Sequence, residues 1–256
     1  MPGRGAGYAA WVEALERRHR ERLTFAEVRR GLQALSSLYV ERRARLARGA
    51  ALEGAGKRAA FALYYGPAHF LLVRAVVRAL GAGAPALRTV LDLGCGTGAA
   101  GAAWALEADA AYDGVDRSGW AVEETRWTLA WFGLRGRARK GDLVESALPS
   151  PPSGVLAAFT VNELDAAPRD RLLARLLDGP GHGLRVLVVE PLARRLAPWW
   201  DGWERGFTAA GGRADQWRLD EPLPETVALL GRAAGLDPAG LGARSLFLPG
   251  RGVDRA

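Results

Sequence analysis

The chain has 256 residues, of which 49% are hydrophobic and 25% are charged, as in an ordinary soluble globular protein. This length accommodates one α/β domain with an appendage and a sizeable core. No stretch approaches the roughly 18 uninterrupted apolar residues of a membrane span, and the first 20 residues lack the apolar segment of a secretory signal. The single cysteine excludes an intramolecular disulfide and a cysteine-based metal cluster. We therefore expect a cytoplasmic protein with no membrane span and no metal.

Positive charge gathers in the N-terminal third. Residues 1–88 hold 16 Lys and Arg against 6 Asp and Glu, whereas residues 89–256 hold 19 against 22. Almost all of this positive charge is arginine, whose planar fork suits phosphate and carboxylate groups, so the basic third suggests an anionic partner such as RNA. The alternative is that a GC-rich genome favours arginine codons and that the helices merely have solvated charged faces.

The same third predicts helices in succession. Apolar residues recur at helical spacing over residues 8–23, 25–48, 57–65 and 68–80. Thr24 and Glu27 form a capping-box pattern before the second helix, and Gly66-Pro67 predicts a break between the last two. A loop over 81–85 then leads to the first strand. We expect a boundary at 81–88, between a basic helical region (1–88) and a second domain (89–256).

Three glycines follow the apolar run at residues 89–93, which reads as a strand buried on both faces. Gly94, Gly96 and Gly98 alternate with other residues, and an alanine-rich helix former comes next. Glycine accepts positive φ and has no Cβ to block a ligand. A strand, a glycine turn and a helix in this order bring the backbone close to a nucleotide-like ligand.

Beyond this loop, strands and helices alternate, which is the mark of a doubly wound parallel sheet. Further strands are expected at 111–116, 138–140, 155–161 and 185–190, with helices at 119–133 and 168–177. The tail predicts a strand at 216–219, a helix at 223–234 and a strand at 243–248. An irregular segment after residue 197 carries three tryptophans that could face a substrate, Trp199, Trp200 and Trp203.

Three aspartates are candidates for ligand binding. Asp116 lies 22 positions after Gly94 at the carboxyl end of a strand, where it can accept hydrogen bonds from ribose hydroxyls or simply cap a helix. Asp142 follows the next strand on the same rim, where it can meet an adenine edge or cap a turn. Asp92 lies inside an apolar strand, so its carboxylate needs a partner such as a ligand ammonium or the N–H groups of the loop. The Gly-x-Gly-x-Gly spacing argues against a dinucleotide such as NAD.

The segment 90–98, with Asp116 and Gly141-Asp142-Leu143, resembles the successive motifs of the class I S-adenosylmethionine-dependent methyltransferases. This resemblance implies a Rossmann-like, mostly parallel seven-stranded sheet that ends in an antiparallel hairpin, preceded here by the N-terminal helical extension. It also implies that S-adenosylmethionine is the cofactor. Its methionine end would lie along the glycine loop, its ribose at Asp116 and its adenine at Asp142 and Leu143. The residues expected at the cofactor are Asp92, Gly94, Cys95, Gly96, Gly98, Asp116, Asp142 and Leu143.

A narrower resemblance is carried by short motifs in the same order along the chain. They are Leu35-Ser36-Ser37-x-Tyr39, Ala60-Phe61-Ala62-x-Tyr64-Tyr65-x-Pro67-Ala68, Asn162-Glu163-Leu164 and Val189-Glu190-Pro191. They are similar to those of a methyltransferase-like family associated with the small ribosomal subunit, which implies rRNA or that subunit as a partner. Members of that family carry cysteines for a metal cluster in the C-terminal half. This chain has only Cys95, so no metal site is expected.

The methyl-acceptor side of such sites usually follows the fourth strand. The chain has Asn162-Glu163-Leu164-Asp165 there instead of Asn/Asp-Pro-Pro-aromatic, so methylation of a base amine is not supported. Glu163 could act as a base or orient the acceptor, and Asn162 could equally be a helix N-cap. Three hypotheses follow: an enzyme acting on RNA or the small ribosomal subunit, a small-molecule methyltransferase with a helical lid, or a cofactor-binding assembly factor without catalytic activity.

Overall fold

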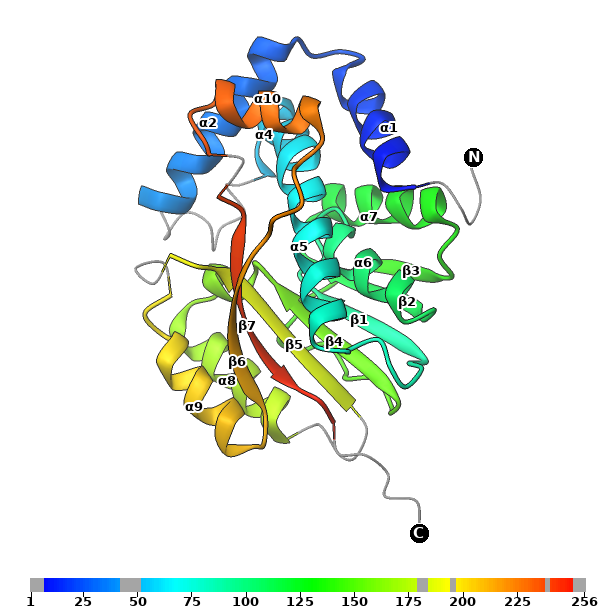
Figure 1. The fold of residues 1–256 in the computed structure, drawn as a ribbon, viewed down its shortest axis with the longest axis vertical. Coiled ribbons are helices and arrows are strands. Elements are labelled where there is room, and N and C mark those ends of the chain that lie inside the picture. Colours follow the sequence, from blue (N-terminus) through cyan, green and yellow to red (C-terminus); the bar gives the residue numbers. More distant parts are fainter. Residues whose placement is uncertain (1–6, 42–51, 179–183, 194–196, 238–239, 251–256) are drawn as a thin grey trace.

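A seven-stranded sheet forms the centre of the computed structural model, which describes residues 7–41, 52–178, 184–193, 197–237 and 240–250 (Figure 1). The strand order is β3-β2-β1-β4-β5-β7-β6. The strands are β1 (Thr89–Leu93), β2 (Ala111–Asp116), β3 (Gly136–Lys140), β4 (Ser153–Ala158), β5 (Leu184–Pro191), β6 (Arg213–Arg218) and β7 (Gly242–Leu248). β1 to β5 are parallel, and β7 runs antiparallel between β5 and β6. The predicted doubly wound, Rossmann-like sheet with its closing hairpin is therefore confirmed.

Helices cover both faces of this sheet and its upper end in Figure 1. In the described part of the chain they are α1 (Tyr8–Arg20), α2 (Phe25–Glu41), α4 (Ala55–Ala60), η2 (Phe61–Tyr65), α5 (Gly66–Ala79), α6 (Ala99–Glu107), α7 (Gly119–Phe132), η3 (Val161–Glu163), α8 (Ala166–Asp178), α9 (Trp200–Ala209) and α10 (Glu225–Ala233). Helices α5 and α6 lie on one face, and α8 and α9 lie on the other. The N-terminal helices α1 and α2 and the late helix α10 gather above the sheet.

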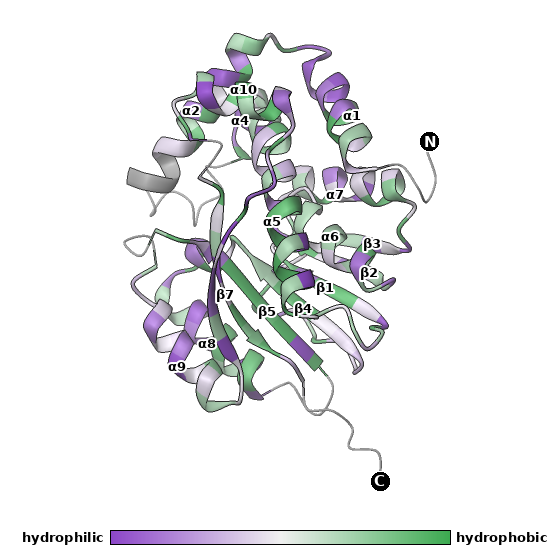
Figure 2. Ribbon diagram, viewed as in Figure 1, coloured by the Kyte–Doolittle hydropathy of each residue, from purple (hydrophilic) through white to green (hydrophobic). Residues whose placement is uncertain are grey.

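The central strands are apolar on both sides because each side faces a packed layer. In β5, Leu187 and Val189 join the core under α5 and α6, whereas Val186 and Val188 join the core under α8 and α9. Figure 2 shows β5 green, that is hydrophobic, along most of its length. Alternate side chains of a strand point to opposite faces, so a strand covered on both faces reads as an unbroken apolar run.

The N-terminal helices share the first of these cores. Trp11 of α1, Leu71 of α5 and Trp104 of α6 are all buried in it. The loop before β1 is tied down as well, because Ala82 O accepts hydrogen bonds from Trp104 Nε1 (3.2 Å) and Arg185 Nη1 (3.0 Å). The boundary expected at 81–88 stays a prediction, but the helices on its N-terminal side pack directly on the sheet domain.

The predicted break at Gly66-Pro67 is wrong. One continuous helix runs over Ala55–Ala79, and its middle turn, Phe61–Tyr65, is π-helical. The N–H of Gly66 donates to Phe61 O, five residues back, so the wider turn lies directly before Pro67, which has no N–H to donate. This helix is long and apolar enough to cross a membrane by length and composition alone. It is 72% buried over its most apolar stretch, as in the core helix of a folded domain.

Other element ends differ from the sequence expectations. α1 ends at Arg20 instead of residue 23, and residues 42–48 of the second expected helix lie outside the described residues. β4 ends at Ala158 because Phe159 turns to a positive φ of 57°. The segment expected to be irregular after residue 197 contains α9, which buries Trp200 and Trp203 against the sheet. These two rings are core residues because their helical spacing aligns them with Phe207 on one face.

We expect Trp203→Ala to lower the free energy of unfolding by about 3–5 kcal/mol, because it leaves a large cavity in a fully packed core. Chemical denaturation followed by circular dichroism measures this change. Leu229→Ala is the matched control, because Leu229 is 51% exposed and its truncation should change the unfolding free energy by less than about 0.5 kcal/mol. Equal effects of both variants would contradict the assignment of α9 to the core.

Candidate cofactor site

The glycine loop is fixed by hydrogen bonds to the end of β2. The N–H groups of Gly94 and Cys95 both donate to Val115 O, at 2.8 and 3.1 Å. One residue on, the N–H of Gly96 donates to Asp116 Oδ2 at 3.0 Å. The loop therefore continues the pairing with β2 past the end of β1.

Gly94, Gly96 and Gly98 all have positive φ, at 75°, 54° and 73°. A Cβ at Gly94 would overlap Thr160, and a Cβ at Gly98 would overlap Thr125. Both requirements, left-handed backbone and close approach, point to glycine. Gly98 is also the N-cap residue of α6, so the loop delivers the chain to a helix N-terminus as the sequence predicts.

Asp116 holds its position through both carboxylate oxygens. Oδ2 accepts from Gly96, and Oδ1 accepts from the N–H of Ser118 at 2.8 Å. The side chain remains half-buried at the pocket wall. Each oxygen keeps a second lone pair, so the carboxylate can still accept bonds from ribose hydroxyls.

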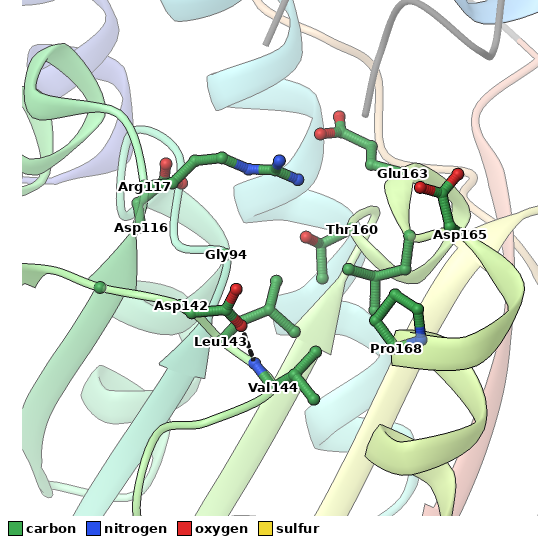
Figure 3. Close-up of a pocket in the computed structure, with 12 residues that line it drawn as sticks. Gly94, Asp116, Arg117, Asp142, Leu143, Val144, Thr160, Glu163, Asp165 and Pro168 are labelled. Carbon is green, nitrogen blue, oxygen red and sulfur yellow. Dashed lines mark hydrogen bonds between the residues drawn. The ribbon is translucent and has the colours of Figure 1, made fainter. Parts of the chain in front are cut away.

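A pocket lies where the carboxyl ends of β1, β2, β3 and β4 meet (Figure 3). Five residues singled out from the sequence line it together: Gly94, Asp116, Asp142, Leu143 and Glu163. Further lining residues are Arg117, Gly141, Val144, Thr160, Leu164, Asp165 and Pro168. Gly141, Leu164 and Asp165 belong to motifs quoted from the sequence, although no role was assigned to them. Arg117, Val144 and Pro168 were missed, and Arg117 and Val144 directly follow predicted residues. Thr160 lies in the fourth expected strand, and its packing against Gly94 places it at the pocket.

Asp142 and Leu143 form the side of the pocket opposite the glycine loop. Asp142 is exposed, and its Oδ1 accepts from the N–H of Val144 at 2.7 Å, which is the turn-capping geometry. Its other oxygen faces no partner that would prevent a ligand contact in the described structure. Leu143 is buried and presents apolar surface to the pocket. An apolar wall beside a carboxylate suits an adenine ring and its amino edge.

Asp92 and Cys95 lie behind the loop and do not line this pocket in the described part of the chain. The O–H of Tyr112 donates to Asp92 Oδ2 at 2.8 Å, and the carboxylate also bonds the N–H of Gly101. Burial raises the pKa of Asp92 to about 7. Its partners are thus Tyr112 and α6 instead of the expected ligand ammonium or loop N–H groups. Cys95 is a buried packing residue that accepts a hydrogen bond from Thr125 Oγ1 at 3.3 Å.

Asn162 is turned away from the pocket by three hydrogen bonds. Its N–H and its Nδ2 donate to the two oxygens of Glu190, at 3.2 and 2.5 Å, and its Oδ1 accepts from Trp199 Nε1 at 2.9 Å. Helix α8 begins only at Ala166, so Asn162 is not its N-cap. The amide is a structural bridge between β4 and β5, and it satisfies the wholly buried Glu190, whose pKa burial raises to about 8.

Glu163 differs from its neighbour because it lines the pocket. Burial raises its pKa to about 7, with Asp116 adding to the rise and Arg117 opposing it. Figure 3 shows Arg117 reaching across the opening above Gly94 and Thr160, towards the side that carries Glu163.

The pocket fits S-adenosylmethionine on three observations. Its walls carry the carboxylates of Asp116, Asp142, Glu163 and Asp165, which suit a ligand with a net positive charge. Gly94 brings the backbone of the glycine loop to the pocket, and Leu143 gives it an apolar wall beside Asp142. In the described residues, no group of three or more His, Cys, Asp or Glu could hold a metal ion.

We expect Asp116→Ala to weaken binding of S-adenosylmethionine at least about tenfold, because it removes a ribose acceptor and also frees the glycine loop. Isothermal titration calorimetry measures this affinity. The control is Asp113→Ala on the same strand, whose carboxylate pairs at the surface with Arg137 at 3.2 Å. If the Asp116 variant binds the cofactor as tightly as the wild type does, its role in the site is refuted.

Comparison with known proteins agrees with this geometry. Residues 90–178 match a family described as a methyltransferase domain. No curated protein sequence matches the chain. Among solved structures, an O-methyltransferase family protein from Burkholderia thailandensis is 13% identical, with a TM-score of 0.53 over 97% of this chain and 72% of that one. The mitomycin 7-O-methyltransferase MmcR is 18% identical, with a TM-score of 0.51 over 83% of this chain, which spans 59% of the length of MmcR.

At these identities the solved structures establish the fold, and the family match adds the domain type for residues 90–178. The matched segment begins at β1 and ends with α8, so it contains the glycine loop, Asp116, Asp142 and Glu163. The fold and the pocket thus agree with a methyltransferase domain over residues 90–178.

Proposed function

We propose that this chain is an S-adenosylmethionine-dependent methyltransferase that acts on RNA and that its N-terminal helices help to hold that RNA. One observation carries the proposal: cations and aromatic rings alternate beside the cofactor pocket. We call Arg58, Phe61, Arg117 and Trp120 the basic–aromatic surface. Both arginines are exposed and both rings are half-exposed.

The members of this surface come from two distant parts of the chain. The Arg58 guanidinium lies 6.0 Å from the centre of the Trp120 ring, and Phe61 meets Trp120 edge to face at 6.4 Å. Phe61 also covers the glycine loop, since its ring atom Cε1 lies 3.2 Å from the position of a Cβ at Gly96. Arg117 lines the cofactor pocket itself. The surface is therefore adjacent to the site of methyl transfer.

Such a surface suits single-stranded nucleic acid. Aromatic faces stack on bases of any sequence, and arginine forks meet phosphates with two parallel hydrogen bonds. The cofactor supplies a reactive methyl group on a sulfonium, so the protein has chiefly to hold donor and acceptor in line. We assign that holding role to the basic–aromatic surface. The motifs shared with the family associated with the small ribosomal subunit favour rRNA as the RNA.

Most of the other described arginines of the N-terminal third are engaged within the protein. Arg18 pairs with the buried Glu124 at 3.0 Å, and Arg74 and Arg78 pair with Glu221 and Glu107 at 2.9 and 2.7 Å. Arg17 and Arg20 pair with acids one turn away on α1. Much of the positive charge of residues 1–88 is thus neutralised by ion pairs within the protein. We therefore confine the proposed RNA contact to the basic–aromatic surface.

A small-molecule acceptor is the second candidate, and the aromatic cover over the loop favours it. His69 stacks on Phe159 with ring centres 3.8 Å apart, and Phe61 and Tyr65 lie next to His69. Burial lowers the pKa of His69 to about 3, so the whole cluster is uncharged at neutral pH. A neutral aromatic cover suits a planar organic acceptor, and MmcR acts on mitomycin. In this reading the N-terminal helices are a lid.

We expect Trp120→Ala to weaken binding of a small-subunit rRNA fragment by about 1–3 kcal/mol, the usual contribution of one stacked base. Arg58→Ala should weaken binding and lower the slope of log affinity against log salt by about 1, since one phosphate contact is lost. Fluorescence anisotropy at several salt concentrations measures both effects. Arg213→Ala, at an exposed arginine on β6 paired with Asp215, is the control and should leave RNA affinity unchanged.

Transfer of a labelled methyl group to fractionated RNA, protein and small molecules separates the hypotheses. Label in RNA supports the proposal, and label in small molecules alone supports the lid reading. Cofactor binding without any transfer indicates an assembly factor. Negligible RNA affinity at low salt refutes the RNA proposal, whichever fraction is labelled. The cytoplasmic location stays a prediction.

A further inference from the structure

The pocket that binds the cofactor is strongly acidic, and its ligand loses a charge in the reaction. Asp116, Asp142, Glu163 and Asp165 line the pocket, and Arg117 is the one cation among the described lining residues. S-adenosylmethionine carries a sulfonium, an ammonium and a carboxylate, so its net charge is +1. The demethylated product, S-adenosylhomocysteine, is a thioether with no net charge.

We propose that Glu163 makes the pocket selective for the charged cofactor over the uncharged product, through the negative charge that its carboxylate adds to the pocket on the side of β4. The inference rests on the binding of the cofactor and not on the identity of the methyl acceptor. It gives Glu163 a role in binding and product release instead of the role of base.

Position singles out Glu163 among the acidic residues of the pocket. It lies on the η3 turn directly after β4, and its N–H donates to Thr160 O at 3.0 Å, which fixes the turn against the residue that packs on Gly94. In Figure 3 its side chain lies across the pocket from Asp116. The two carboxyl groups therefore border the pocket from the ends of different strands, Asp116 from β2 and Glu163 from just after β4, and Arg117 reaches across the opening between them.

The neighbouring acids cannot act as the same switch. The carboxylate of Asp116 already accepts hydrogen bonds from two backbone N–H groups, and Asp142 and Asp165 are exposed to solvent. Glu163 instead titrates near neutrality, because burial and Asp116 raise its pKa to about 7 while Arg117 opposes them. Its other titratable neighbour is Glu190, which lies behind the pocket, bonded to Asn162 and facing Arg244 across the β5–β7 pair.

The direction of the pH effect follows from linkage. A bound cation favours the ionised form of Glu163 and so lowers its pKa, which means that binding near pH 7 releases a proton. Affinity for S-adenosylmethionine should then rise with pH between 6 and 8. A pKa decrease of about one unit corresponds to a rise of about tenfold. The product has no net charge, so its affinity should stay nearly constant over this range.

Calorimetric titration with S-adenosylmethionine and with S-adenosylhomocysteine at pH 6, 7 and 8 tests the proposal on the full chain. The wild type should gain about fivefold in the ratio of the two affinities from pH 6 to pH 8, because this range covers most of a tenfold linkage between the two pKa values. Repeating the cofactor titration at pH 7 in two buffers of different ionisation enthalpy measures the released protons. In Glu163→Gln the ratio should be independent of pH and the proton release should vanish, whereas Glu163→Asp should retain part of both.

Asp170→Asn is the matched control, because Asp170 is an exposed carboxylate on the adjacent helix α8 and outside the pocket lining. It should behave as the wild type. A pH-independent ratio in the wild type overturns the proposal without any variant. A pH dependence that survives in Glu163→Gln and vanishes in Glu190→Gln overturns it in favour of the buried neighbour. Failure of both ligands to bind overturns the cofactor assignment itself, so the two failures are distinguishable.

Discussion

The hydrogen bond from the Gly96 N–H to the Asp116 carboxylate is the constraint on which the site depends. It joins the turn after β1 to the end of β2, so the loop and the carboxylate that we predict to bind ribose cannot move independently. The same carboxylate fixes the start of α7 through the N–H of Ser118. One side chain thus sets the distance between the two ends of the cofactor site. The loop can reach this carboxylate because its glycines adopt left-handed backbone conformations.

Buried acidic groups cluster around this centre. Asp92 lies on β1, Glu163 lies just after β4, and Glu190 lies near the end of β5. Burial raises the pKa of each carboxyl group to between about 7 and about 8. Holding carboxyl groups in such surroundings costs folding free energy unless partners compensate. Tyr112 compensates Asp92, and Asn162 compensates Glu190. Glu163 has the pocket on one side instead, which leaves its charge available to a ligand.

The sequence was sufficient to predict the order of strands and helices, because strands buried on both faces and glycine turns leave local signals. It also placed Gly94, Asp116 and Asp142 at one rim, since the carboxyl ends of parallel strands share an edge. The sequence could not show that Asp92 is bonded within the protein and not to a ligand, because Tyr112, the hydrogen-bond donor to Asp92, lies 20 residues further along the chain. Trp203 was misjudged for a similar reason: an aromatic cluster reads alike in a substrate loop and on a buried helix face. The continuity of Ala55–Ala79 could not be predicted either, since Gly-Pro is a frequent helix break and a π-turn has no clear sequence signal.

The π-helical turn at Phe61–Tyr65 determines which side chains of the helix Ala55–Ala79 face the glycine loop and which face the core. Its wider turn accommodates one residue more than an α-turn, so the faces before and after it are offset by about 100° relative to an unbroken α-helix. With this offset Phe61 faces the glycine loop while Phe70 and Leu71 face the core shared with Trp11. The same helix thus places Phe61 over the glycine loop and Phe70 and Leu71 in the core, and the additional residue of the π-turn gives these two faces their relative orientation. Deleting one residue from Phe61–Tyr65 would leave a helix of nearly the same composition. The deletion would, however, rotate Phe61 away from the glycine loop.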